Sequence, residues 1–324
     1  MKRVFITGVS GLLGTNLVHY LLERNYEVIG LVRNKLSYKG KLHSNLELRE
    51  GSLFDDFSPL FREIDYIIHI AAITAQDIPK YKQYRTINSE ATKQLFLMAK
   101  VAKVKGFVFV SSANTMGNGS LLSPGNESKP VSKPFADSFY AKSKLEAENY
   151  LIANQKGIHL CIINPCFMLG AYDSKPSSGK IILRALNKSF IFHPPGGKSF
   201  VHVADVCQAI WKGLQTETSG QKFLIGNENL SYKEFYTKFN QLTGHKSKLI
   251  EIPKWILLSA GYLGNFLRFM GISTPLSSTN MKMLFSDNYY SNQKSIEELG
   301  VKYQPIESGM TEAIEYLKKE FNKG

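Results

Sequence analysis

The N-terminal stretch MKRVFITGVSGLLG places three glycines, Gly8, Gly11 and Gly14, directly behind the apolar run from Val4 to Thr7. A turn between a strand and a helix receives a dinucleotide best when it is made of glycine. Glycine permits a sharp bend, close approach of the pyrophosphate to the backbone, and tight packing of the helix on the strand. The spacing Gly-x-x-Gly-x-x-Gly is a weak signal alone, since glycine-rich turns are common. Its place behind the first apolar run predicts a dinucleotide-binding α/β fold.

Short apolar runs and longer helical patterns alternate through the first half of the chain. The runs that we expect to form strands span 4–7, 28–32, 46–50, 66–71, 107–111 and 160–164, and the clearest helical patterns span 12–24 and 90–104. This alternation is typical of βαβ units, and it predicts a Rossmann-type, doubly wound parallel sheet.

The composition changes after Pro165, where loop-like stretches rich in Gly, Pro and Ser replace the regular alternation. We therefore expect residues 1–165 to form the nucleotide-binding core and residues 166–324 to form mainly a smaller substrate-binding lobe. Segments at about 200–227 are expected to return to the core.

The three cysteines, Cys161, Cys166 and Cys207, have neither the number for a disulfide framework nor the spacing of metal ligands. We interpret them as core residues of a protein in the reducing cytoplasm, and we predict no metal site. The chain has no stretch typical of a signal peptide and no window of about 18 uninterrupted apolar residues, so no membrane span is expected.

The formal net charge of +13 would attract anionic ligands, nucleic acid or an acidic membrane surface. However, the basic residues are scattered, and no run of five or more is present. We therefore expect a generally basic surface and a small-molecule partner, and no nucleic acid.

The end of the second predicted strand bears on the choice of dinucleotide. An acid that binds the ribose of NAD is expected there, but the stretch EVIGLVRNK ends in Arg33 with Lys35 close by. A guanidinium can hold a 2′-phosphate through two parallel hydrogen bonds. The stretch favours NADP(H) over NAD(H), although NAD(H) remains compatible with it and Arg33 has an alternative interpretation as a solvated surface residue.

Tyr140 and Lys144 lie four residues apart in SFYAKSKLEAENYL, hence on one face of a predicted helix. An ammonium beside a phenol favours the phenolate and brings a tyrosine towards the range where it can transfer protons. Ser111 and Ser112 end the fifth predicted strand, at the sheet edge where Tyr140 is also expected. A hydroxyl there can orient a substrate oxygen while the tyrosine moves its proton.

Six motifs in order, TGVSGLLG, HIAA, VSSANTMG, YAKSK, NPCFMLG and FVHVADV, resemble the extended short-chain dehydrogenase/reductase family. The resemblance runs from residue 2 to about residue 206 and is greatest to the dihydroflavonol-4-reductase-like and 3β-hydroxysteroid-dehydrogenase-like branch. Nucleotide-sugar epimerases are more distant relatives. The stretch from 288 to 319 also resembles the end of that branch.

The resemblance implies a catalytic set of Ser112, Tyr140 and Lys144, with Ser111 as the second candidate for the serine. Tyr140 would be the acid/base, and Lys144 would hydrogen-bond the nicotinamide ribose. The family often has Asp where this chain has Ser52, which weakens the adenine contact expected there. The cofactor contacts that it implies, together with those from the glycine turn, are Gly8, Ser10, Gly11, Leu12, Leu13, Gly14, Arg33, Lys35, Ser52, Leu53, Ala71, Ala72, Ser111, Tyr140, Lys144, Pro165 and Met168.

Three polar residues near these motifs are interpreted as structural. His69 ends a buried strand with no carboxylate near it in sequence. Asp205 is expected to cap a helix or to make a structural hydrogen bond, and Asn88 to support the helix beneath the site.

The stretch from Trp255 to Ile272 is strongly apolar and carries Arg268 as its one charge. A helix that covers an apolar substrate pocket is the first interpretation. An interface or core helix and peripheral membrane contact are the alternatives.

These observations favour an NADP-dependent carbonyl reductase or alcohol dehydrogenase whose substrate is partly hydrophobic. A nucleotide-sugar epimerase or dehydratase is the alternative, although the Asp-Glu pair typical of the dehydratases is replaced by Ala113 and Asn114. A regulatory protein that binds NADP(H) without turnover is a third hypothesis. The sequence does not determine the substrate, the direction of the reaction or whether the protein forms a homodimer.

Overall fold

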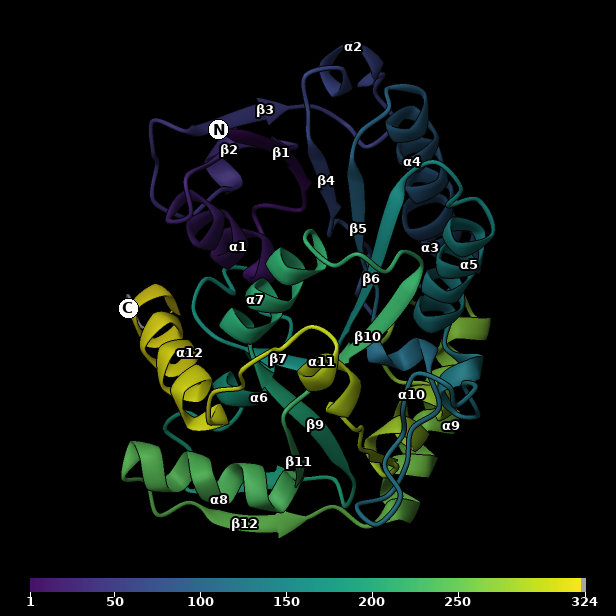
Figure 1. The fold of residues 1–324 in the computed structure, drawn as a ribbon. Helices are drawn as coiled ribbons and strands as arrows, with labels where there is room; N and C mark the ends of the chain where they lie inside the picture. The colour runs from purple at the N-terminus through teal and green to yellow at the C-terminus, as the bar shows by residue number, and fades with distance from the viewer. Residues whose placement is uncertain (322–324) are drawn as a thin grey trace.

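A parallel sheet of seven strands forms the centre of the computed structural model, which describes residues 1–321 (Figure 1). The strand order is β10-β6-β5-β4-β1-β2-β3, and every neighbouring pair is parallel. The Rossmann-type fold and all six predicted strands are confirmed. The strands are β1 (Lys2–Thr7), β2 (Tyr26–Val32), β3 (Leu46–Glu50), β4 (Tyr66–His69), β5 (Gly106–Val110), β6 (His159–Pro165) and β10 (Gln221–Ile225).

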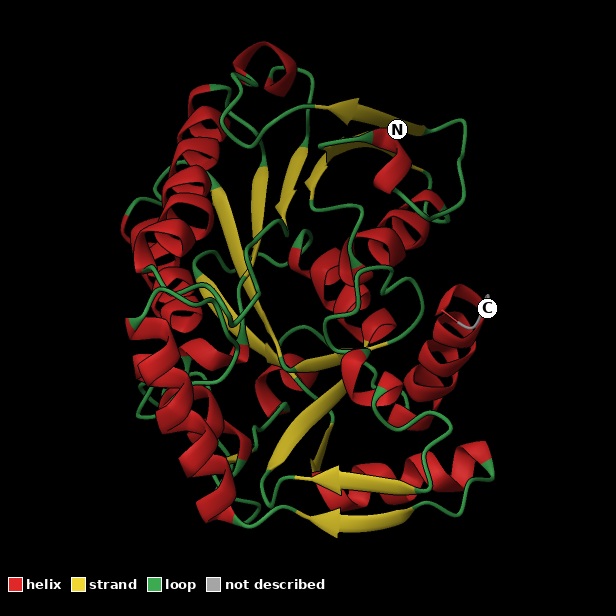
Figure 2. Cartoon of the chain, turned by 180° about the vertical axis from the view of Figure 1, so that it is seen from behind, coloured by secondary structure: helices red, strands yellow, loops and turns green. Residues whose placement is uncertain are grey.

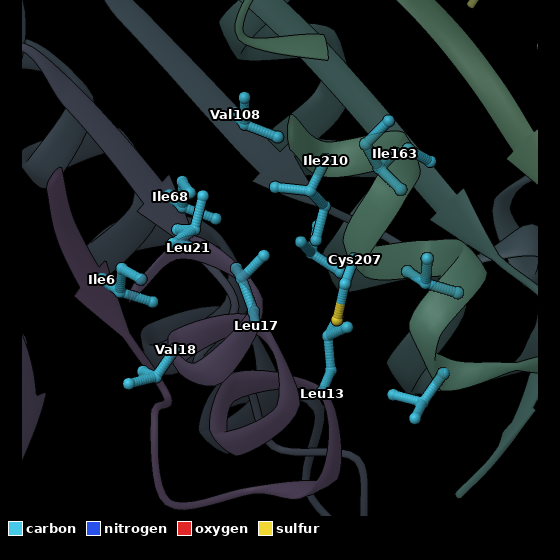
Figure 3. Close-up of a cluster of buried hydrophobic side chains, with 14 of the residues drawn as sticks. Ile6, Leu13, Leu17, Val18, Leu21, Ile68, Val108, Ile163, Cys207 and Ile210 are labelled. Atoms are coloured by element: carbon cyan, nitrogen blue, oxygen red, sulfur yellow. The ribbon is translucent and has the colours of Figure 1, made fainter. Parts of the chain in front are cut away.

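Helices cover both faces of this sheet (Figure 1). On one face, α1 (Leu12–Leu22) and α7 (Val203–Gly213) pack on the strands through a shared apolar cluster, in which Leu13 and Leu17 face Cys207 and Ile210 (Figure 3). The opposite face is covered by α2 (Ser58–Phe61), α4 (Ala91–Val101) and α5 (Phe139–Ala153). The sheet is therefore buried on both sides, which explains why its strands are nearly continuous apolar runs.

The strand order reverses between β1 and β4, because β1 connects through α1 to β2 on one side while β4 lies on the other. Ligands of such sheets bind beyond the carboxyl ends of the strands at this reversal. The short elements around it are η1 (Lys35–Ser37), α3 (Tyr81–Arg85), the π-helical turn η2 (Thr86–Glu90), η3 (Ala113–Thr115) and η4 (Phe135–Asp137).

The second half of the chain builds two small sheets and their helices below the main sheet, as the view from behind also shows (Figure 2). In one sheet, β9 pairs with β7, β11 and β13, while β8 and β12 form the other. The strands are β7 (Phe167–Leu169), β8 (Phe190–His193), β9 (Gly197–His202), β11 (Glu228–Ser231), β12 (Lys248–Glu251) and β13 (Asp287–Asn288). The helices are α6 (Lys180–Leu183), α8 (Tyr232–Thr243), α9 (Lys254–Phe269), α10 (Ser278–Leu284), α11 (Gln293–Glu297) and α12 (Ile306–Phe321).

The apolar stretch from Trp255 to Ile272 forms the expected helix, α9, as far as Phe269, but most of its bulky side chains are exposed, with Leu257 as the buried exception. Gly261 and Gly264 are buried against the segment that leads into α10, where added Cβ atoms would lie 2.9 and 2.3 Å from backbone atoms. Trp255 is 68% exposed and Phe269 is 89% exposed. The glycine face of α9 therefore makes the close contact with the protein.

Candidate active site

The glycine turn between β1 and α1 has the shape that a dinucleotide requires. Gly8 has a φ of +79°, and a Cβ there would lie 2.8 Å from the Ala71 backbone nitrogen. A Cβ on Gly14 would lie 2.1 Å from the Gly8 carbonyl oxygen, so this glycine permits the helix to pack against the turn. A Cβ on Gly11 would make one ordinary contact, at 3.6 Å, so its outer side is open to a ligand. The turn thus fits a pyrophosphate group.

The other residues of the turn contribute backbone groups. Gly11 is the N-cap of α1 and has no side chain to cap the helix, so the first amides of α1 are available to an anion. Leu12 and Leu13 are buried in the core, and Ser10 is half-buried beside them. The side chains of the two leucines hold the helix start in place while their amides face the turn.

The carboxyl end of β2 carries Arg33 and Lys35, both exposed. The sequence offered no carboxylate at this end, but the sheet brings one: Glu50 on β3 is the register partner of Val32. Its Oε1 accepts a hydrogen bond of 2.8 Å from the Lys35 amide. Neighbouring strand ends meet at the sheet edge although they are far apart in sequence, which is why sequence reasoning missed Glu50.

Beyond β3, the amide of the exposed Ser52 donates a hydrogen bond of 2.8 Å to the Asp55 carboxylate. The family often has Asp at position 52 itself, whereas in this chain the acid that orders the loop lies three residues later. Leu53 is half-buried next to it. On the other side of the turn, Ala71 and Ala72 follow β4, and the Ala71 amide donates to the Thr7 hydroxyl at 3.2 Å. This bond holds the chain after β4 over Gly8.

The structure places Tyr140 and Lys144 on the first two turns of α5, and Ser112 at the N-cap of η3 just after β5. Ser138 caps α5 by accepting a hydrogen bond from the Ala141 amide, which fixes the start of the helix. Burial raises the pKa of Tyr140 to about 12, and a hydrogen bond with Ser112 offsets this only in part. A bond from Lys144, one turn further along α5, to the Val110 carbonyl oxygen holds this helix beside the end of β5, two residues before Ser112.

Lys144 is fully buried, and its Nζ donates a hydrogen bond of 2.7 Å to the Val110 carbonyl oxygen at the end of β5. Its ammonium also lies 4.5 Å from the centre of the Phe109 ring. Burial lowers the pKa of Lys144 to about 7, which the charge of Glu148 only partly counteracts. Lys144 thus fastens α5 to β5 with an ammonium that loses its proton readily.

The expectation that Lys144 lowers the tyrosine pKa is not met in this structure, because burial dominates at both groups. Desolvation disfavours the charged form of each side chain, so the phenol keeps its proton while the lysine loses its own more easily. Tyr140 can therefore donate a proton at neutral pH.

A buried carboxylate, Glu148, lies behind the serine loop and was missed by sequence reasoning. Its Oε1 accepts hydrogen bonds from Ser111 at 2.5 Å, Thr115 at 2.7 Å and Asn164 at 2.7 Å. Its Oε2 forms an ion pair of 2.6 Å with Lys222 on β10. The Ser111 hydroxyl is therefore engaged in this network, whereas the Ser112 Oγ lies outside it and accepts a hydrogen bond of 3.2 Å from the Asn114 amide.

A cavity of about 150 Å³ opens beside the serine. Pro165 ends β6 at its wall, whereas Met168 packs against the core cluster of α1 and α7. Cys161 and Cys207 are buried core residues as expected, but Cys166 is only half-buried and lines the cavity, which corrects the prediction for that thiol. The lining residues are Ser112, Ala113, Asn114, Pro165, Cys166, Phe167, Lys198, Ser199, Asn288 and Tyr290.

The residues interpreted as structural have structural contacts. Both ring nitrogens of His69 bond threonine hydroxyls, at 2.7 and 2.9 Å, and burial lowers its pKa to about 3. Asn88 bridges the chain after β4 and α5 through Ile73 and Ser143. Asp205 accepts hydrogen bonds from the backbone amide and the side chain of Gln304, whereas the N-cap of α7 is His202.

Within residues 1–321, no three side chains among His, Cys, Asp and Glu are grouped so that they could hold a metal ion. No helix in the described part of the chain has the length and apolar character needed to cross a membrane.

Known proteins share both the sequence pattern and the fold. A putative dihydroflavonol 4-reductase of Synechocystis sp. is 28% identical, over 97% of this chain and 94% of the relative. A 3-beta-hydroxysteroid dehydrogenase of Mycolicibacterium neoaurum is 26% identical, over 99% and 93%. The crystal structure of gox2253 superposes with a TM-score of 0.86 at 25% identity and covers both chains fully. The model of the NAD dependent epimerase/dehydratase family matches residues 4–226, and the chain belongs to this family.

Proposed function

We propose that the protein is an NADP(H)-dependent oxidoreductase that interconverts a carbonyl and a hydroxyl group with Ser112, Tyr140 and Lys144. The observation that carries the proposal is that the Lys144 bond to Val110 fixes the helix that carries Tyr140 beside the end of β5, two residues before Ser112, and that Ser112 lines a cavity. Its relatives named as reductases and dehydrogenases support the same reaction class.

The roles of the three residues follow from their surroundings. The Tyr140 phenol keeps its proton at neutral pH and would donate it to the substrate oxygen as negative charge develops there. Ser112 would orient that oxygen through its hydroxyl. Lys144 would hold α5 against β5 and present an ammonium beneath the site, fixing the distance between phenol and serine.

The protonation state of Tyr140 bears on the direction of the reaction. A phenol with a pKa raised to about 12 is present almost entirely as the acid at pH 7, which suits proton donation to a carbonyl oxygen. Oxidation of an alcohol requires the phenolate, whose fraction rises tenfold per pH unit below the pKa. The phenol is thus in the protonation state that carbonyl reduction requires, while the equilibrium between ketone and alcohol is set by the cofactor ratio and the pH.

The nicotinamide cofactor would supply the hydride. The open outer side of Gly11 and the first amides of α1 would hold its pyrophosphate, and Pro165 would face the nicotinamide. Arg33, exposed at the end of β2 with Lys35 near it, would hold the 2′-phosphate of NADP(H). Glu50 lies at the same edge, and its negative charge would repel a phosphate. The preference for NADP(H) therefore depends on the attraction of Arg33 and Lys35 exceeding this repulsion.

The test measures binding and turnover together. The purified protein is titrated with NADPH and with NADH, and a panel of ketones and UDP-sugars is then screened for NADPH consumption. Tighter binding of NADPH and oxidation of NADPH by a ketone support the proposal. Tighter binding of NADH contradicts the assignment of Arg33, and conversion of a UDP-sugar without net NADPH consumption indicates an epimerase.

A further inference from the structure

The cavity beside Ser112 has a second end, which the proposed reaction does not use. Ser112 and Pro165 line the side towards the sheet, and Lys198 and Asn288 line it from the small sheet of β9 and β13. Lys198 and Asn288 are direct register partners on these parallel strands, so their side chains lie on the same face, next to each other. The cavity thus connects the hydroxyl at the reaction centre with an ammonium and an amide.

The Lys198 ammonium has no anionic partner among residues 1–321. Across residues 1–321, none of the ion pairs or side-chain hydrogen bonds involves its Nζ. The Nζ lies 5.3 Å from the centre of the Phe167 ring, a cation–π contact that helps to hold a charge away from water. Burial lowers the pKa of Lys198 to about 8, so most of the side chain is still charged at pH 7.

The Asn288 side chain is a second polar group of the cavity that lacks a partner in the described part of the chain. Asn288 is 6% exposed, and its Oδ1 is buried without a hydrogen-bond partner in the described part of the chain. A buried amide left without a partner destabilises the fold unless something else satisfies it. Since rotation of the amide exchanges its donor and acceptor, Asn288 can bond either a hydroxyl or a carboxylate oxygen.

Tyr290 keeps these groups in register with the reaction centre. Its hydroxyl donates to the Ala113 carbonyl oxygen at 3.0 Å, directly after Ser112, and its amide donates to Asn229 at 3.1 Å. The β13 end that carries Asn288 is therefore tied to the serine loop by a direct hydrogen bond. Both ends of the cavity belong to one fixed structure.

We propose that Lys198 and Asn288 form an anion subsite, so that the substrate is an oxo acid whose carboxylate pairs with Lys198 while its carbonyl lies at Ser112 and Tyr140. This inference rests on the proposed function for the reacting end and on the unpaired Lys198 for the other. The cavity volume of about 150 Å³ lies below the roughly 300 Å³ at which pockets for drug-sized ligands begin. It therefore accommodates a short oxo acid, or the carboxylate end of a larger one.

The experiment compares acids with their neutral esters. Binding of 2-, 3- and 4-oxopentanoate and of their methyl esters is measured by ligand-observed NMR on the wild type, Lys198→Met and Lys198→Arg. Lys302→Met, at an exposed lysine outside the cavity lining, is the matched control for loss of one charge. The same compounds are assayed as substrates with NADPH.

We expect the wild type and Lys302→Met to bind at least one acid roughly 10- to 100-fold more tightly than its ester, as a charge-assisted hydrogen bond predicts. Lys198→Met loses this preference and Lys198→Arg keeps most of it. The inference is overturned if the wild type binds acids no better than esters, if it binds no acid at millimolar concentrations, or if Lys198→Met keeps the preference. Binding of an acid without hydride transfer refutes the proposed function alone, and reduction of ketones without acid preference refutes the subsite alone.

Discussion

The ammonium nitrogen of Lys144 lies 2.7 Å from the carbonyl oxygen of Val110, and this contact joins the helix that carries Tyr140 to the strand that leads to Ser112. The two residues are 34 positions apart in the chain. The contact fixes the position of the helix that carries Tyr140 relative to Ser112. It also buries a cation, which lowers the stability of the fold by an amount that depends on pH.

Replacing Lys144 by Met should stabilise the fold and abolish activity. Because burial lowers the pKa of Lys144 from 10.5 to about 7, the unfolded chain binds a proton between these pH values that the folded chain does not. The wild type therefore loses stability as the pH falls from 10.5 to about 7, and the penalty is constant below that. We expect Lys144→Met to gain on the order of 1–4 kcal/mol at neutral pH.

Urea unfolding of both proteins near pH 6.5 and near pH 9.5 measures this effect. The gap between variant and wild type should narrow at the higher pH, since the unfolded lysine is then partly neutral. An equal gap at both pH values would show that burial of the charge is not the cause.

The Glu148–Lys222 ion pair predicts a strong difference between single and double replacements. Glu148→Leu leaves Lys222 and three hydrogen-bond donors without their acceptor, so we expect a loss of about 3–5 kcal/mol. The double variant Glu148→Leu with Lys222→Leu removes both charges, so its loss should be smaller than the sum of the two single losses.

Thermal unfolding of the four proteins, including the wild type, gives the comparison. Additive losses in the double variant would indicate that the pair is not coupled.

The glycine turn predicts opposite outcomes at two neighbouring positions. Gly14→Ala places a Cβ 2.1 Å from the Gly8 carbonyl oxygen, so the turn or helix must shift and stability should fall by roughly 1–3 kcal/mol or more. Gly11→Ala meets only an ordinary contact of 3.6 Å and should fold like the wild type. Its methyl group would nevertheless narrow the approach to the backbone, and we expect NADPH affinity to fall about tenfold or more.

Fluorescence titration with NADPH, alongside melting temperatures, separates the two effects. Normal NADPH binding by a well-folded Gly11→Ala variant would argue against the pyrophosphate position.

Arg33→Ser should reduce affinity for NADPH by roughly 10- to 100-fold while leaving NADH binding nearly unchanged, because only NADPH carries the 2′-phosphate. Arg49→Ser, on the adjacent strand β3, is the control for the loss of one positive charge. If Arg33→Ser lost affinity for NADPH and for NADH equally, Arg33 would act through the overall charge of the protein and not through the 2′-phosphate.

Much of the fold follows from local patterns, and six of the seven strands of the main sheet are where apolar runs predict them. The predicted site residues are likewise local, since Tyr140 and Lys144 need only the period of a helix to share a face. The groups that were missed depend on contacts between distant segments. Glu148 reads as a solvated helix residue in KLEAEN, and only the sheet brings Thr115, Asn164 and Lys222 to it.

Lys198 was missed for the same reason. The stretch HPPGGKS looks like a surface loop in the sequence. In the structure, its last three residues begin β9, and Lys198 pairs with Asn288 on the two-residue strand β13, about 90 positions later. No periodic pattern marks a strand as short as β13. The expected pKa of Tyr140 was wrong because spacing reveals the neighbouring ammonium but not the burial of both groups.

The reaction of Tyr140 gives the most direct test of the whole account. Once a ketone is found that the wild type reduces with NADPH, kcat/KM for that ketone is measured for Tyr140→Phe, with NADPH affinity and melting temperature as controls for binding and folding. The account predicts that Tyr140→Phe binds NADPH normally, folds normally and loses roughly 100-fold or more in kcat/KM, since it lacks the proton donor. Full turnover by Tyr140→Phe would contradict it.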